Sequence, residues 1–345
     1  MNQGKHFLLV LFLLNGGIFM ASQPYNKQWD EEIYRQVNDY NKEALDDWLL
    51  ELQVQGKTEK TIYQYTRNVK LFFIWIYKYR KNKPISELKK KDFRNYLLYL
   101  KDLDLSPARI NSMKSAVSSF LTYLSEEEDY EDDVNINYMQ KLKSIPKEEV
   151  REVVFLTEEE CKIIYNKLKL NKKYTELLLL ALMYESGARR NELYQLEVRH
   201  IDLKANETTD KVVGKRKKKF TLFYGEWTKE AFKLYMENRP ETECESLWVN
   251  EEGEQYSYDW IYFVAKTWNK IIEDIMKYNP NLTAHSLRHS FAQNMFDGTH
   301  HIAKGKPISI ATIQIMMHHT DMSTTQSYLK PMDSSIVTKE LGWDE

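Results

Sequence analysis

The chain has 345 residues, 42% of them hydrophobic and 29% charged, which favours two folded domains and argues against collagen-like or wholly disordered sequence. Its 49 Lys and Arg residues and 51 Asp and Glu residues leave a net charge of −2, so net charge alone does not identify a nucleic acid partner and any basic surface must be local. The two cysteines, Cys161 and Cys244, argue against a disulfide framework and form no CxxC metal motif, so a reducing, cytoplasmic setting is expected.

The amino-terminal segment contains Lys5 followed by the apolar run Phe7–Leu14. The run resembles the core of a signal peptide, but it is shorter than the ~20 apolar residues that a membrane helix needs. In a bacterial gene, Asn15-Gly16-Gly17 could be translated from a purine-rich ribosome-binding sequence ahead of a start codon at Met20. We therefore predict that residues 1–19 are a misassigned extension, with a signal or anchor as the alternative, and we expect no membrane association of the working protein.

Helical spacing of apolar residues predicts four helices in a first domain at residues 27–135. The first helix buries a face that includes Leu45, Trp48 and Leu52 and ends at Gly56. The other three are predicted from Thr58, from Lys90 to Leu100, and from the cap Ser106-Pro107 to Leu124.

Basic residues on two of these helices are candidate contacts to DNA phosphates. These are Arg67, Lys70, Arg109 and Lys114. Charged residues outside a helix are more often simply solvated, so these residues do not identify a DNA-binding surface by themselves.

The acidic run Glu126–Asp133, followed by Ile145-Pro146, predicts the connection between domains. We assign residues 136–152 to the linker and residues 153–345, with a carboxy-terminal tail, to a second domain.

The second domain is predicted to be mainly helical with a small β-hairpin. A capping box at Thr157–Glu160 opens a helix, and Leu177–Met183 predicts a helix buried on most sides. Segments 211–213 and 220–224 predict the hairpin, whose turn carries the basic residues 215–219, and further helices are expected at 228–236 and 259–276. The expected fold class is therefore mainly α with a small hairpin or sheet (α+β).

Four fragments of this domain could carry chemistry: residues 187–193, the basic hairpin, residues 285–289, and His319 with Tyr328. Each alone has an ordinary explanation as surface or core. His285 and His289 have the i, i+4 spacing of zinc-binding histidines, but Ser286 stands where that motif needs its glutamate, so no metal site is predicted.

Order and spacing change this interpretation. The second domain contains four motifs in a fixed order: Gly-x-Arg-x-x-Glu-Leu, a Gly-Lys hairpin, His-x-x-Arg-His, and a histidine nine positions before a tyrosine. This arrangement strongly resembles the tyrosine recombinase (phage integrase) family from Leu156 to Lys330. The resemblance implies a two-domain DNA clamp, a helical core-binding domain followed by a catalytic domain, that needs no cofactor. It also implies a set of catalytic residues, which are Arg189, Lys215, His285, Arg288, His319 and Tyr328.

The implied chemistry fits these residue types. Tyr328 can form a phosphotyrosyl link, while Arg189 and Arg288 can each make bidentate contacts to the phosphate. Lys215 can protonate the leaving oxygen, and the two histidines can assist proton transfer or donate a hydrogen bond to the phosphate. Glu192 is interpreted as a residue that orients the site.

The chain departs from the family pattern at three places. His318 stands where the family usually has glycine, and could crowd the loop or offer a rival histidine. Arg216 replaces the second hairpin glycine, so Lys217 or Lys218 could compete with Lys215, and both are further candidates to contact DNA. An insertion at 300–307 is predicted to be a surface loop.

The predicted function is site-specific cutting and rejoining of double-stranded DNA through a 3′-phosphotyrosyl intermediate, in a phage or other mobile element. We expect a homo-tetramer on DNA, with a possible accessory protein that bends DNA or sets direction. The alternatives are a catalytically silent DNA-binding regulator on the same fold and a monomeric topoisomerase of the same chemistry.

Overall fold

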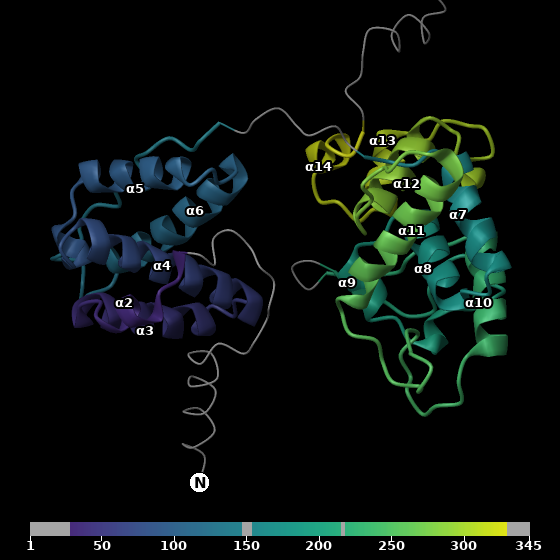
Figure 1. Ribbon diagram of the computed structural model, residues 1–345, viewed down its shortest axis with the longest axis horizontal. Coiled ribbons are helices and arrows are strands. Elements are labelled where there is room, and N and C mark those ends of the chain that lie inside the picture. Colours follow the sequence, from purple (N-terminus) through teal and green to yellow (C-terminus); the bar gives the residue numbers. More distant parts are fainter. Residues whose placement is uncertain (1–27, 147–153, 215–217, 330–345) are drawn as a thin grey trace, which may run out of the picture. The chain divides into compact units, whose positions relative to one another are not determined.

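The computed structural model describes residues 28–146, 154–214 and 218–329, which belong to two compact units at 1–150 and 151–345 (Figure 1). Both units are built mainly from helices, and the described part of the second contains a two-stranded sheet. The predicted fold class is confirmed. The predicted extension 1–19, Lys215, Lys217 and most of the carboxy-terminal tail lie outside the described residues.

The first unit consists of helices, two of which begin at the predicted positions Thr58 and Ser106. Its elements are α2 (Glu31–Arg35), α3 (Asp39–Val54), α4 (Glu59–Tyr79), η2 (Ile85–Glu87), α5 (Lys90–Asp102) and α6 (Pro107–Leu124). The side chains of Thr58 and Ser106 accept hydrogen bonds from the backbone N–H three residues on, which satisfies donors that a helix start leaves unpaired. Gly56 follows α3 with a φ of +66°, as a glycine after a helix end commonly does.

Aromatic rings fill much of the core of the first unit. Trp48 of α3 stacks on Tyr65 of α4 with ring centroids 5.8 Å apart, and Phe120 of α6 lies 5.2 Å from Trp48. Large rings bury more apolar area than aliphatic side chains do, so the three longest helices of this unit share one apolar core.

Part of the predicted linker packs on the first unit instead of leaving it. Met139 is fully buried, and Asn111 of α6 exchanges two hydrogen bonds with the backbone of Ile145, at 2.8 and 2.9 Å. The acidic run is also held to the unit, because the Tyr130 hydroxyl donates to Asp47 at 2.5 Å. Residues 136–146 therefore form part of the first unit, and the prediction that they belong to a linker is wrong.

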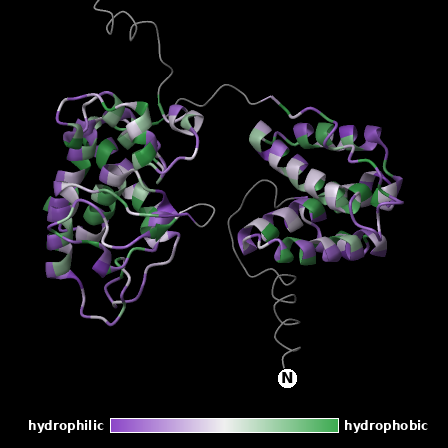
Figure 2. Cartoon of the chain, turned by 180° about the vertical axis from the view of Figure 1, so that it is seen from behind, coloured by the Kyte–Doolittle hydropathy of each residue, from purple (hydrophilic) through white to green (hydrophobic). Residues whose placement is uncertain are grey.

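The second unit is arranged around helix α8 (Tyr174–Ser186), most of which is buried. Its elements are α7 (Glu158–Leu170), α8 (Tyr174–Ser186), α9 (Arg190–Tyr194), η3 (Val198–His200), β1 (Val212–Val213), β2 (Lys219–Phe220), α10 (Glu226–Asn238), α11 (Trp260–Met276), α12 (Ser286–Phe296), η5 (His301–Ala303), α13 (Ile310–Met316) and α14 (Met322–Gln326). Helix α8 contacts α7, α10 and α12, and its residues from Leu177 onward are buried. Figure 2 shows helices of both units carrying hydrophilic and hydrophobic residues side by side, as expected for amphipathic helices around a core.

The predicted hairpin is present but shorter than expected. Strands β1 and β2 pair antiparallel with Val212 opposite Phe220. Beyond Phe220 the chain pairs elsewhere, because the Thr208 N–H donates to the Leu222 carbonyl at 2.9 Å. Within the described ranges, no helix is both long and apolar enough to cross a membrane.

Candidate active site

A tight turn after α8 brings the first motif into position. Gly187 ends the helix with a φ of +58°, and a β-carbon built there would lie 2.4 Å from the ring of Phe291 on α12. Only glycine suits both the left-handed backbone and this close approach. The turn therefore seats α8 directly against α12 and places Arg189 at the start of α9.

Arg189 is held by Glu192 through two separate bonds. Its Nη1 lies 2.9 Å from Glu192 Oε1, and its backbone N–H donates to Glu192 Oε2 at 2.7 Å. The Glu192 side chain is 1% exposed, whereas that of Arg189 is 28% exposed. A buried carboxylate thus holds both the backbone and one Nη atom of an arginine whose side chain still reaches solvent, which is the arrangement an orienting residue requires.

Arg288 joins three segments of the second unit. Arg288 is 1% exposed, and its Nη1 donates to the Gly187 carbonyl. Its Nη2 lies 2.8 Å from the Met317 carbonyl oxygen and 2.6 Å from His319 Nε2. Burial and the nearby charge of Arg189 lower the pKa of Arg288 to about 10, so the guanidinium remains charged at neutral pH. A single buried cation therefore fixes the turn at Gly187 relative to the segment that carries His319.

The hydroxyl of Tyr328 is bonded to His285. Its Oη lies 2.7 Å from His285 Nε2, and the residue is 8% exposed. Although part of His285 is exposed, the desolvation of its ring and the positive charges of His289 and Arg288 lower its pKa to about 4. The imidazole is neutral at neutral pH, so its Nε2 can accept the proton of the tyrosine.

His289 is a residue of this site that the sequence analysis did not assign. Its ring stacks on Tyr328 with centroids 4.3 Å apart and planes at 29°, and its Nδ1 lies 3.4 Å from the Tyr328 carbonyl oxygen. The i, i+4 spacing with His285 was the available signal, since it places both rings on one face of a helix. That spacing was considered only for zinc.

Thr325 was also missed, and it orients His319. The Thr325 hydroxyl is buried and lies 2.9 Å from His319 Nδ1. Because Arg288 can only donate, His319 Nε2 accepts from it, and the ring proton is on Nδ1, facing Thr325. Burial and the charges of Arg288 and Arg189 lower the pKa of His319 to about 3, which keeps this ring neutral.

The base of the hairpin lies against the segment that carries His319. Of its basic residues, Lys218 and Lys219 are described and exposed, and the Lys218 carbonyl accepts a 2.7 Å hydrogen bond from Gly214 N–H. His318, which the sequence analysis considered as a source of crowding, instead stacks on Phe220 of β2. The described residues therefore bring Arg189, His285, Arg288, His319 and Tyr328 into one site.

The comparisons with known proteins cover both units. The model of the Phage integrase family matches residues 154–334, and that of the phage integrase N-terminal SAM-like domain matches residues 45–131. The chain belongs to the phage integrase family. This confirms the resemblance to tyrosine recombinases that the sequence suggested.

Curated relatives of this integrase-family chain match along most of its length. It is 25% identical over 316 residues to the SPbeta prophage-derived recombinase-like protein YomM of Bacillus subtilis, covering 86% of this chain and 88% of that protein. It is 29% identical over 303 residues to the tyrosine recombinase XerD of Staphylococcus saprophyticus, covering 85% and 95%.

Solved structures share the fold. A XerH site-specific recombinase bound to a palindromic difH substrate has a TM-score of 0.65 at 18% identity, covering 84% of this chain and 82% of that one. The Tn1549 transposon integrase in complex with a circular intermediate DNA has a TM-score of 0.64 at 14% identity, covering 87% and 98%.

The insertion at 300–307 is not simply a surface loop. His300 is fully buried and His301 is half-buried, while residues 304–307 are exposed as expected. His300 stacks on Tyr184 of α8 with ring centroids 4.3 Å apart. The prediction is wrong for these two histidines because aromatic and carboxylate partners on α7 and α8 hold them inside.

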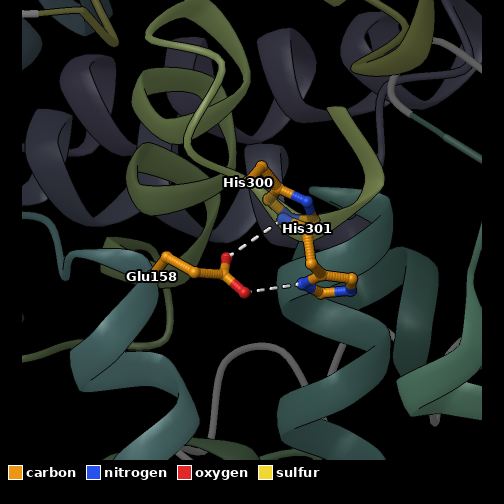
Figure 3. A group of neighbouring side chains, drawn as sticks. All are labelled: Glu158, His300 and His301. Atoms are coloured by element: carbon orange, nitrogen blue, oxygen red, sulfur yellow. Dashed lines mark hydrogen bonds and ion pairs between the residues drawn. The ribbon is translucent and has the colours of Figure 1, made fainter. Parts of the chain in front are cut away.

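Glu158, His300 and His301 are the one group of potential metal ligands found among the described residues, with ligand atoms within 4.8 Å of one another (Figure 3). Both ring nitrogens of His300 already bond to backbone groups, and His301 lies between two carboxylates, 2.9 Å from Glu158 and 2.8 Å from Glu185. The two imidazole rings stack at 4.5 Å and 28°. In-plane lone pairs of stacked rings do not converge on one ion, so the cluster fits a buried ion triad better than a metal site.

The predicted DNA contacts of the first unit have different surroundings. Lys70 is 9% exposed, with its Nζ 4.8 Å from the ring centroid of Tyr34 on α2, and burial lowers its pKa. The prediction that it faces outward is wrong, because α2 packs on α4 and covers it.

The other three candidates in this unit remain at least partly accessible. Arg67 lies over the Trp29 ring at 5.7 Å, Arg109 donates to Asn68 at 2.8 Å, and Lys114 lies 3.4 Å from the Ser144 hydroxyl. Each still shows part of its surface to solvent, so these three remain candidates for phosphate contacts.

Proposed function

We propose that this chain is a site-specific recombinase that cuts DNA with Tyr328 and rejoins it to another DNA end. The observation that carries the proposal is the 2.7 Å contact between the Tyr328 hydroxyl and a neutral His285, beside the guanidinium of Arg288. A nucleophile, a base and a counter-charge are the groups that phosphoryl transfer without a metal needs.

In the proposed reaction, the Tyr328 oxygen attacks the phosphorus and the bond from phosphorus to the 5′ oxygen breaks. The tyrosine proton passes to His285 Nε2, and the leaving 5′ oxygen takes a proton from Lys215. The product is a 3′-phosphotyrosyl ester, which conserves the energy of the broken bond so that a second 5′-hydroxyl can reverse the step.

Arg189 and Arg288 would hold the non-bridging oxygens of the phosphate. Arg189 has one Nη atom held by Glu192 and its side chain partly exposed, so the rest of the guanidinium can meet the phosphate directly. Arg288 has both Nη atoms on protein acceptors, and a phosphate would replace His319 as one of them. His319 would donate to the same phosphate if its ring proton moves to Nε2, with the Thr325 hydroxyl then donating to Nδ1.

A phage or other mobile element is the proposed setting, with a homo-tetramer on DNA in the cytoplasm and an accessory protein that bends DNA or sets direction. The prophage origin in the name of the Bacillus subtilis relative and the transposon integrase among the similar folds support this setting.

The test begins with the Tyr328→Phe protein, which keeps the ring that stacks on His289 and loses only the hydroxyl. Duplexes that it binds are selected from a randomised pool and rebuilt as nicked suicide substrates, which trap a covalent intermediate because the cut fragment diffuses away. The unmodified protein should form a DNA adduct on a denaturing gel, and Tyr328→Phe should form none.

Specific binding by both proteins without an adduct would contradict the proposal and favour the DNA-binding regulator. Relaxation of supercoiled DNA that lacks the selected site would instead favour the topoisomerase.

A further inference from the structure

His318 adopts a backbone conformation that usually belongs to glycine. Its φ is +54°, in the left-handed region, where a residue with a β-carbon costs about 1–2 kcal/mol. The residue directly precedes His319, which bonds to Arg288. A strained residue next to a reactive group suggests that its side chain makes a contact that offsets the strain.

That contact is a stack between His318 and Phe220. The ring centroids are 3.6 Å apart and the planes lie at 17°. The His318 Nε2 is buried and has no hydrogen-bond partner among the described residues, whereas the backbone of Thr221, next to Phe220, hydrogen-bonds to the ring. Since Nε2 is closed off from solvent, the ring acts through packing and cannot deliver a proton to DNA from that atom.

Phe220 in turn supports the base of the hairpin turn. A β-carbon built on Gly214 would lie 2.4 Å from the Phe220 ring, so the ring fills the space against the glycine backbone. The Gly214 N–H also donates to the Lys218 carbonyl at 2.7 Å, which closes the turn. His318, Phe220 and Gly214 therefore form a continuous contact from the segment that carries His319 to Gly214 and Lys218, the residues that flank 215–217.

We propose that His318 is a positioning residue, which holds the base of the β1–β2 hairpin against the loop that carries His319. The inference rests on the proposed function, in which the turn of this hairpin carries the general acid, Lys215. Loosening the base of the hairpin should then slow proton delivery to the leaving 5′ oxygen, and should leave the attack by Tyr328 intact.

The test uses His318→Gly and His318→Phe in the full chain. Glycine relieves the left-handed backbone and removes the ring, so a loss of activity cannot come from added strain. Phenylalanine keeps a stacking ring and removes both nitrogens. Each variant is first compared with the unmodified protein by thermal unfolding, to establish that the second unit is folded.

Each protein is then assayed for cleavage of two nicked substrates. One has the ordinary phosphodiester, and the other has sulfur in place of the 5′ bridging oxygen, so that the bond from phosphorus to sulfur breaks and a thiolate leaves without needing a proton. General-acid catalysis is typically worth ~100 to 10,000-fold. We expect His318→Gly to cut the ordinary substrate about 10 to 100-fold more slowly, as a partial loss of that factor, and to cut the sulfur substrate at nearly the unmodified rate.

The Phe variant should cut both substrates within a few-fold of the unmodified protein. Equal rates for His318→Gly and the unmodified protein on the ordinary substrate would overturn the proposal. An equal slowing of His318→Gly on both substrates would also overturn it, because that result would indicate a general structural role. A Phe variant as slow as the Gly variant would overturn it as well. Failure of the unmodified protein to cut either substrate would instead refute the proposed function.

Discussion

His301 lies between two carboxylates, one half-buried and one fully buried, and its charge state has a measurable consequence. Its Nδ1 is 2.9 Å from Glu158 and its Nε2 is 2.8 Å from Glu185, whose side chain is fully buried. Carboxylates only accept hydrogen bonds when ionised, so both ring nitrogens must carry protons. Burial alone would lower the pKa of His301, but the hydrogen bonds to Glu158 and Glu185 raise it to about 9.

The rise from 6.5 to about 9 corresponds to about 3 kcal/mol of folding free energy, at roughly 1.36 kcal/mol per pKa unit. Since the folded-state pKa is raised, this contribution is complete below pH 6.5 and is lost as the pH rises through about 9. The pKa values of Glu158 and Glu185 are lowered from 4.5, mainly by hydrogen bonds that outweigh burial. Their contribution is present above pH 4.5 and is lost as the pH falls further.

The perturbation is His301→Gln, which removes the charge and leaves the two carboxylates without a cation. We expect the variant to unfold at lower urea, with the second unit about 3 kcal/mol less stable at pH 6, and the difference should shrink as the pH approaches 9.5. Fluorine NMR of fluorotryptophan at Trp248, which is fully buried in the second unit, follows that unit separately. Lys306→Gln removes an exposed charge from the same insertion and is the matched control.

Histidine NMR gives the direct measurement. His301 should show the doubly protonated imidazolium pattern at pH 7 and lose it near pH 9, while His300, whose pKa is lowered to about 4 by burial and by the charge of His301, should be neutral throughout. A His301 ring that titrates near 6.5, or a stability difference that does not change with pH, would refute the reasoning.

Three further outcomes are expected. Gly187→Ala should destabilise the second unit by about 2–5 kcal/mol, because left-handed strain adds to the overlap with Phe291. Gly56 has a φ of +66° with open space around its α-carbon, so Gly56→Ala should cost only the backbone strain. Equal losses of stability for the two variants in thermal unfolding would contradict this. Arg288→Lys should be nearly as damaging to cleavage as Arg288→Ala, because an ammonium cannot bridge the same acceptors; single-turnover rates near those of the unmodified protein would contradict it. The cleavage rate should show no histidine titration between pH 5.5 and about 8, because His285 is already neutral there with a pKa of about 4, and a step near pH 6.5 in the rate profile would argue against His285 as the base.

Local sequence was sufficient for much of the fold. The starts of α4, α6 and α7 follow Thr58, Ser106 and the Thr157 capping box, because a cap satisfies backbone donors within three residues of itself. The buried helix α8 was predicted from the apolar run Leu177–Met183, which is also a property of neighbouring residues in the sequence. The predicted pairing of 220–224 with 211–213 was too long, because residues beyond Phe220 pair with Glu207 and Thr208, which precede the predicted first arm.

The spacing of short motifs indicated the family and nominated the site residues, because phosphoryl transfer limits which side chains can serve. It did not indicate His289 or Thr325, whose roles depend on which rings and hydroxyls meet across the fold. Nor did it indicate that Lys70 is covered, since burial of an outer helix face depends on the helix that packs there.

The sequence by itself thus determined many of the helices, several of their starts and the order of the reactive groups, since these depend on neighbours along the chain. Only the tertiary structure decided how those groups contact one another. The guanidinium of Arg288 bridges residues 187 and 317, and His301 contacts one carboxylate on α7 and another on α8. Such contacts join segments more than 100 residues apart, and their distances and their effects on pKa arise only when packing excludes water from between them.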